Sequence, residues 1–213
     1  LSACETAAKR LATGENGEPE VLTAAALTSR AEPQRKLSEL LRGLATPADA
    51  LSQDIHILIQ SSESKTLEFK QTLSLDIRTR QKEKWIETSA FKTVAAFLNS
   101  DGGTLLIGVS DDHKPLGLGE EIKLLYKGST DKFLLHFKNQ LRQNIGEEFY
   151  PLIDYRLVKV DNALILQVEC GPAPEPCFME NAFYVRTNPA TDKLEGQKML
   201  KYVQAHFTGT NNR

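Results

Sequence analysis

The short apolar run at 104–109, Thr-Leu-Leu-Ile-Gly-Val, constrains the fold of this chain more than any other stretch. Gly102 and Gly103 come directly before it, and Asp111 and Asp112 follow it closely. A short apolar run between turn residues is typical of a strand that is buried on both faces, inside a sheet covered by helices. The sequence therefore predicts an interior strand over 104–109.

A helix is predicted just before this strand, over residues 85–99. Apolar residues recur along it at the spacing that keeps one helical face toward a core. They are Ile86, Ala90, Val94 and Phe97. We interpret Gly102 and Gly103 as the turn from helix to strand, because glycine adopts the backbone conformations that such turns need.

A second strand is predicted over 67–70, where Leu67 and Phe69 alternate with Glu68 and Lys70. Successive side chains of a strand point to opposite faces. We therefore expect the two apolar residues to enter the core and Glu68 and Lys70 to share the other face. Glu63 lies five residues before Glu68, on the approach to this strand.

The rest of the chain predicts an α/β (α+β) fold, a mixed β-sheet packed with helices. The hydrophobic patterns give further strands over 155–160, 163–169 and 183–187, and further helices over 130–144 and 193–207. We expect 155–160 and 163–169 to form a hairpin, 111–117 to form a turn, 73–84 to be a polar loop, and 55–59 to be a helix end or an edge strand.

Two parts are expected along the chain. Residues 1–60 are interpreted as a helical N-terminal appendage or linker, with helical stretches near 22–27 and 37–44, and residues 61–213 as the main domain. Because the sequence begins with Leu1, we expect it to be part of a longer protein.

Charge and cysteine content limit the function classes. The first 60 residues contain 6 Lys or Arg and 8 Asp or Glu, of totals 26 and 28, which leaves 20 of each sign in residues 61–213. Any affinity of the main domain for nucleic acid must therefore come from local patches. Cys4, Cys170 and Cys177 resemble neither a disulfide framework nor a zinc site. No run could span a bilayer and no secretory signal opens the chain, so we expect a cytoplasmic protein with no membrane partner.

Three blocks of sequence resemble one known family, the Schlafen AlbA-type domain, once catalogued as a divergent AAA domain. The resemblance covers about residues 61–207. The blocks are Glu63 with Glu68-Phe69-Lys70, the run 95–112 around Gly102-Gly103, and the proline-rich loop 174–176 followed by the strand that ends in Arg186.

The resemblance implies a compact α/β domain with two kinds of function. In bacteria and archaea such domains occur in regulators of transcription and are treated as DNA-binding or nucleotide-binding modules. In animal Schlafen proteins a related core cleaves RNA with two glutamates and an aspartate, whose positions here are Glu63, Glu68 and Asp111. Ser110 departs from the family pattern, which often has an acid at this position.

The acidic positions predict a metal site that would serve the nuclease function. Glu63, Glu68 and Asp111 could together hold Mg²⁺ or Mn²⁺, the only cofactors we consider, because both ions prefer oxygen ligands. Lys70 on the same face could stabilise developing negative charge, which makes these four residues the catalytic candidates. The alternative is a Glu68–Lys70 pair on a solvated strand face, with Asp111 in a polar turn.

The basic positions predict a contact with nucleic acid that would serve the binding function. A phosphate-binding strip could form from Arg78, Arg80, Lys82 and Lys84. The alternative is a solvated loop that Glu83 and Glu87 partly neutralise.

Two further residues could either contact nucleic acid or have a structural role. Arg186 could contact phosphate or serve a structural role. Trp85 beside the strip could stack on a base, or belong to the core like most tryptophans at helix starts.

Three hypotheses follow from these motifs. The first is a nucleic-acid-binding module, for DNA more than RNA, within a regulator of transcription. The second is a Mg²⁺- or Mn²⁺-dependent nuclease, and the third is a protein-interaction or dimerisation domain, with a homodimer as the partner. A P-loop ATPase is not expected, because the chain lacks the Gly-x4-Gly-Lys-Ser/Thr loop that cradles phosphates.

Overall fold

The computed structural model describes residues 47–207. The described residues from Ala48 onward belong to one compact unit. The expected division into residues 1–60 and 61–213 stays a prediction. The predicted helical stretches at 22–27 and 37–44 lie outside the described residues.

The core of the domain is a four-stranded mixed sheet. Its strand order is β1 (Leu67–Lys70), β4 (Gly103–Ile107), β6 (Ala163–Cys170) and β5 (Ile153–Val160). β1 runs parallel to β4, whereas β6 is antiparallel to both of its neighbours. This confirms the predicted α+β class and places most of the apolar run 104–109 on an interior strand, which ends at Ile107.

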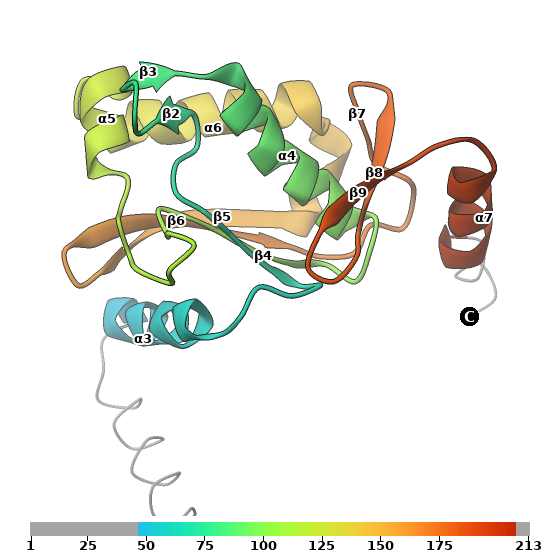
Figure 1. The fold of residues 1–213 in the computed structure, drawn as a ribbon, viewed down its shortest axis with the longest axis horizontal. Coiled ribbons are helices and arrows are strands. Elements are labelled where there is room, and N and C mark those ends of the chain that lie inside the picture. Colours follow the sequence, from blue (N-terminus) through green and yellow to red (C-terminus); the bar gives the residue numbers. More distant parts are fainter. Residues whose placement is uncertain (1–46, 208–213) are drawn as a thin grey trace, which may run out of the picture. The chain divides into compact units, whose positions relative to one another are not determined.

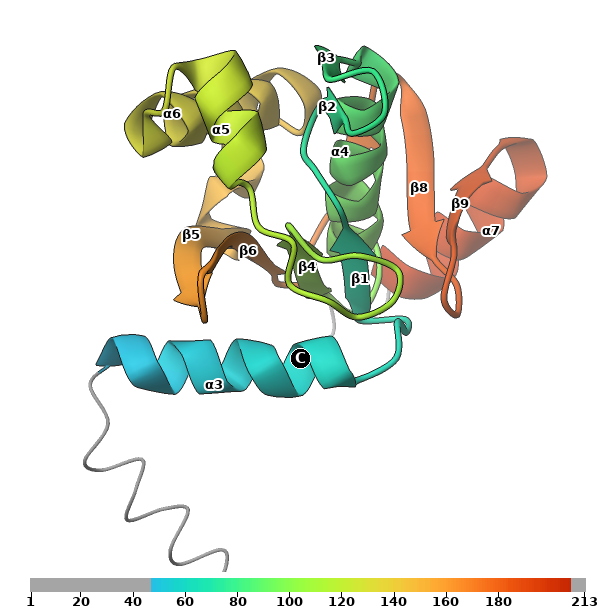
Figure 2. The same ribbon diagram turned by 60° about the vertical axis from the view of Figure 1, so that its left-hand side comes forward.

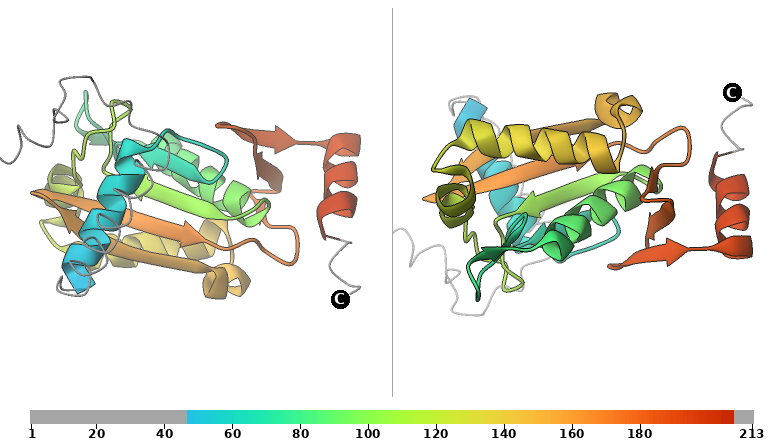
Figure 3. Two further views of the ribbon diagram at one scale, coloured as in Figure 1. Left: turned by 90° about the horizontal axis from the view of Figure 1, so that it is seen from below. Right: turned by 90° about the horizontal axis from the view of Figure 1, so that it is seen from above.

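Helices cover both faces of this sheet (Figure 1). Helix α3 (Pro47–Gln60) lies on one face, and α4 (Lys84–Leu98), α5 (Gly119–Tyr126) and α6 (Thr130–Asn144) lie on the other. Figure 3 shows α3 crossing the sheet on one side and α4 and α6 lying over it on the other. Helix α3 explains the apolar run 55–59, which proves to be a helix end.

The alternation of side chains in the strands connects the two layers. Leu106 packs with Leu67 and Phe69 of β1 and with Ile55 of α3. Leu105, its neighbour along β4, packs into the larger core beneath α4, α5 and α6. Apolar side chains on both faces of β4 are thus buried, which is why its sequence shows no polar alternation.

The remaining elements are short. They are the hairpin of β2 (Leu75–Asp76) and β3 (Gln81–Lys82), the 3-10 helix η1 (Glu147–Leu152), and a three-stranded sheet of β7 (Phe178–Met179), β8 (Ala182–Arg186) and β9 (Thr191–Leu194), followed by α7 (Gly196–Phe207). The three-stranded sheet packs against α4, as Figure 2 shows. The predicted helix 193–207 therefore begins too early, because residues 191–194 form β9.

The paired glycines after α4 are required by close packing. A Cβ atom on Gly103 would lie 2.5 Å from the ring of Phe97, and one on Gly102 would lie 2.5 Å from the carbonyl oxygen of Cys170. Gly102 also has a φ of +78°, which side chains disfavour. This agrees with the turn predicted there.

None of the helices in the described part of the chain is long and apolar enough to cross a bilayer.

Candidate functional site

Glu68 of β1 lies between two cations. One of its carboxylate oxygens accepts a hydrogen bond from the ammonium group of Lys70, and the other accepts one from Arg186 at 2.9 Å. The side chain of Glu68 is only 12% exposed. The Glu68–Lys70 pair considered from the sequence is therefore present, and Arg186 extends it to a cluster of three.

Arg186 ends β8 inside the protein. The residue is 3% exposed, and its guanidinium donates to the carbonyl oxygen of Ser64 at 2.6 Å and to Thr191 Oγ1 at 2.9 Å. It also lies over the ring of Phe97, 5.0 Å from the centroid. The Arg186 side chain has no exposed surface to offer a phosphate, which favours the structural role over the predicted phosphate contact.

The three predicted metal ligands do not form a metal site in this arrangement. Glu63 accepts a hydrogen bond from the backbone N–H of Phe69 at 2.8 Å, where it satisfies the edge of β1. Both oxygens of Glu68 contact cations, and Asp111 is exposed on the loop after β4. Within residues 47–207, no three His, Cys, Asp or Glu side chains are close enough together to hold a metal ion. These carboxylates do not fit a divalent cation without rearrangement.

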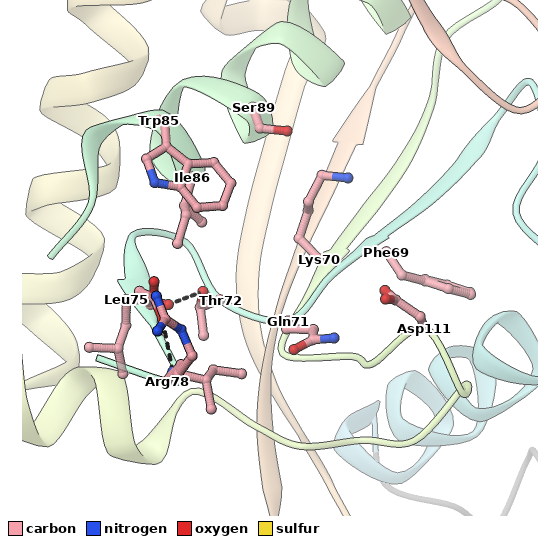
Figure 4. Close-up of a pocket in the computed structure, with 12 residues that line it drawn as sticks. Phe69, Lys70, Gln71, Thr72, Leu75, Arg78, Trp85, Ile86, Ser89 and Asp111 are labelled. Carbon is pink, nitrogen blue, oxygen red and sulfur yellow. Dashed lines mark hydrogen bonds between the residues drawn. The ribbon is translucent and has the colours of Figure 1, made fainter. Parts of the chain in front are cut away.

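A pocket of about 440 Å³ opens at the carboxyl end of β1 (Figure 4). Its walls come from that strand end, the segment 71–78, the first turns of α4, and Asp111. In open α/β sheets, ligands bind beyond the carboxyl ends of the strands, so this is the expected position for a site. The lining residues that matter most here are Lys70, Ile77, Arg78, Trp85 and Ser89.

Trp85 stands at this pocket and is not part of the core. It is 67% exposed, although tryptophan is on average one of the more buried residues. In Figure 4 its indole ring lies on the same side of the pocket as Ile86 and Ser89 of α4, facing the segment that carries Arg78. Of the two roles considered for Trp85, the structure excludes the buried one.

The predicted basic strip is split by the β2–β3 hairpin. Arg80 forms a salt bridge with Glu120, and the ammonium of Lys82 lies 3.7 Å from the carboxylate of Glu87. Within the described residues, neither Arg78 nor Lys84 forms a salt bridge. The four cations therefore do not act together, and only Arg78 of the four lines the pocket.

A turn within the hairpin positions Arg78. A carboxylate oxygen of Asp76 accepts the backbone N–H of Arg78 at 2.8 Å and that of Thr79 at 3.1 Å. These hydrogen bonds, that of Thr79 first, hold the pKa of Asp76 below its ordinary value. An aspartate that stays ionised keeps this turn closed and Arg78 at the pocket.

Glu121 of α5 is a residue that the sequence did not point to. Its buried carboxylate accepts hydrogen bonds from the backbone N–H of Leu73 at 2.9 Å, and from the N–H and the hydroxyl of Ser74, each at 2.8 Å. Burial raises its pKa above the ordinary value. Glu121 thereby fixes the segment that forms one wall of the pocket. Its partners are 47 and 48 residues away in sequence, so no local pattern could identify it.

Comparison with known proteins shows which family the domain belongs to. The family model for Schlafen, AlbA_2 matches residues 63–195. The chain belongs to this family. Among curated proteins none matches it.

Two solved structures resemble this one. The DIP2311 protein from Corynebacterium diphtheriae has a TM-score of 0.50 and 16% sequence identity, with 73% of this chain and 28% of that chain covered. The N-terminal domain of a putative ATP-dependent DNA helicase RecG-related protein from Nitrosomonas europaea has a TM-score of 0.41 and 20% identity, with 68% and 89% covered. This chain thus spans less than a third of the Corynebacterium protein, and that similarity concerns the fold alone.

The pocket lies inside the shared part of the Schlafen AlbA_2 domain. All of its lining residues fall between Phe69 and Asp111, within the matched residues 63–195. Helix α7 begins just after the match ends.

Proposed function

We propose that this Schlafen AlbA_2 domain binds nucleic acid through the pocket at the carboxyl end of β1. The single observation that carries the proposal is that the exposed Trp85 and the exposed Arg78 line the same pocket. An aromatic ring next to a cation is the combination that holds a base by stacking and its phosphate by charge. In the full protein, the domain would serve as the nucleic-acid-binding module of a regulator.

The ion pairs indicate which cations near this pocket are available to a phosphate. Lys70 is neutralised by Glu68 and Arg80 by Glu120, whereas Arg78 at the pocket and Lys84 at the start of α4 form no salt bridge within residues 47–207. An unpaired exposed cation is the residue that gains most from a phosphate, because it gives up no existing partner.

A binding titration of matched variants tests the proposal. We expect labelled DNA or RNA oligonucleotides to bind at low salt, measured by fluorescence anisotropy. The double variant Arg78→Gln/Lys84→Gln should lose about 1–2 kcal/mol, or about 5- to 30-fold in affinity, if each cation contributes what a good surface ion pair does.

The control changes charge by the same amount elsewhere. Lys198 and Lys201 are exposed on α7, outside the pocket. The variant Lys198→Gln/Lys201→Gln should bind like the wild type. Equal losses in both double variants would mean that charge acts without a specific site, and no loss in the first would place the site elsewhere.

The nuclease and dimerisation hypotheses stay predictions. For cleavage, a metal ion at Glu63, Glu68 and Asp111 would first have to displace Lys70 and Arg186 from Glu68. We therefore derive no chemical step through a metal.

A further inference from the structure

We infer that the ligand of this site is a nucleic acid with unpaired bases, and that two successive bases occupy two adjoining pockets. This inference rests on the proposed function and goes further, because it names the class of nucleic acid and adds a second subsite. It is argued from the second pocket, from the balance of charges and from the apolar side chains around both pockets.

The second pocket adjoins the first across the segment 71–77. It has a volume of about 370 Å³, and both pockets are lined by Gln71, Thr72, Leu75 and Ile77. Beyond this shared wall the second pocket continues to Leu116, to Gly119 at the start of α5, and to Asn162 in the β5–β6 turn. Each volume falls in the range of about 300–1,000 Å³ that is typical of small-ligand sites.

The charges around the two pockets are too few for a duplex. Double-stranded nucleic acid offers phosphates on its surface, and affinity then depends on how many of them the protein neutralises. Of Lys70 and the four cations of the predicted strip, Lys70, Arg80 and Lys82 are already engaged by carboxylates, which leaves Arg78 and Lys84. Asp76 and Asp111 also line the first pocket and offset part of this charge. With about two phosphate contacts, most of the affinity must come from the bases.

The exposed apolar side chains point to the same ligand. Ile77 on the shared wall is 47% exposed and Leu116 in the second pocket is 50% exposed, in addition to Trp85. Apolar groups gain nothing from phosphates, but they pack against the faces of unstacked bases. A duplex hides those faces, whereas a single strand or a loop presents them.

The second pocket has the composition of a base site. Gln71 and Asn162 line it and can both donate to and accept from the edge of a base. Glu120, which is paired with Arg80, and the buried Glu121 also line it, whereas no Lys or Arg side chain among the described residues does so to hold a phosphate. The base therefore enters this pocket while its phosphate stays on the side of Arg78.

Gly119 offers a way to close the second pocket without disturbing the fold. A Cβ atom at this position would meet no atom within 4 Å, and its φ is not in the left-handed region. Gly119→Leu should therefore place a side chain in the second pocket, and Gly119→Ala is the matched control that leaves most of the space open.

The chain carries one tryptophan, so Trp85 reports on its own site. We would titrate the domain with a 12-nucleotide poly-dT strand, with its RNA equivalent, and with a duplex of the same length, following intrinsic fluorescence and anisotropy. We expect the single strands to quench Trp85 and to bind at least about tenfold tighter than the duplex. The slope of log K against log salt should be about −1.4 for two phosphates on a single strand. Gly119→Leu should weaken single-strand binding about tenfold, and Gly119→Ala should not.

Each result decides a different point. No binding of any strand would contradict the proposed function itself. Duplex binding as tight as single-strand binding, or single-strand binding without quenching of Trp85, would overturn the present inference and leave the proposed function standing. Single-strand binding that Gly119→Leu leaves unchanged would refute the second subsite.

Discussion

Replacing Arg186 with methionine tests whether this residue is structural or contacts phosphate. Arg186→Met keeps much of the side-chain volume but removes the donors to Ser64, Glu68 and Thr191. Breaking a buried ion pair by removing one partner costs about 3–5 kcal/mol. Because Glu68 keeps Lys70 as a partner, we expect the lower end, about 3 kcal/mol. For a domain of this size that lowers the melting temperature by about 6–12 °C.

The assay is urea unfolding followed by circular dichroism, with nucleic-acid binding measured on the folded variant. Arg156 provides the control, because its side chain is 33% exposed and pairs with two exposed carboxylates, Asp154 at 2.8 Å and Glu169 at 3.1 Å. Arg156→Met should cost less than about 1 kcal/mol. An Arg186→Met variant that is as stable as the wild type but no longer binds nucleic acid would refute the structural role.

Three further predictions follow from the packing, the buried carboxylate and the acidic residues. Gly103→Ala should destabilise the domain by about 1–3 kcal/mol in urea unfolding, because its methyl group would overlap the ring of Phe97; a fully stable variant would contradict this packing. The pKa of Glu121 is raised in the folded state, so its contribution to stability is present at low pH and is lost as pH rises above the ordinary glutamate pKa of about 4.3. The free energy of unfolding of Glu121→Gln should therefore rise relative to the wild type as pH increases from 4 to 8, and a difference that is independent of pH would argue against this burial effect. If Glu63, Glu68 and Asp111 can bind Mn²⁺, Lys70→Met should strengthen the binding, because it frees an oxygen of Glu68, and Glu68→Gln should abolish it. Binding is measured by electron paramagnetic resonance. No Mn²⁺ binding by the wild type or by either variant would end the metal hypothesis.

Elements with a strong local pattern could be predicted from the sequence. Helix α6 has the predicted bounds, Thr130–Asn144, because its apolar residues keep helical spacing and Ser129 caps its first turn by accepting the N–H of Lys132 at 3.2 Å. The interior position of β4 followed from an apolar run between glycines and aspartates. The hairpin of β5 and β6 followed from two apolar runs around Asp161 and Asn162.

Short elements and distant contacts could not be predicted. The strands β2 and β3 have two residues each, too few for a hydrophobic period. Their turn directs Arg80 to Glu120, Lys82 to Glu87 and Arg78 to the pocket. The alternate spacing of these cations in the sequence predicts instead that they share one side of an extended loop.

The ion-pair cluster around Glu68 depends on residues far apart in the chain. Arg186 and Glu68 are 118 residues apart, so the cluster that neutralises Glu68 has no local signature. The exposure of Trp85 could not be predicted for a related reason. Most tryptophans at helix starts are buried, but the exposure of this one depends on where α4 begins relative to the sheet.

The central claim is that nucleic acid binds in the pocket lined by Lys70, Arg78 and Trp85. Its most direct test is a titration of the ¹⁵N-labelled domain with a short single strand, followed in ¹H–¹⁵N correlation spectra. Because the chain has one tryptophan, its spectrum contains a single indole N–H signal, which belongs to Trp85 without further assignment. We predict that this signal shifts first, together with backbone signals of 70–78 and 85–89. An unchanged indole signal, with shifts confined to β5 or α7, would contradict the account.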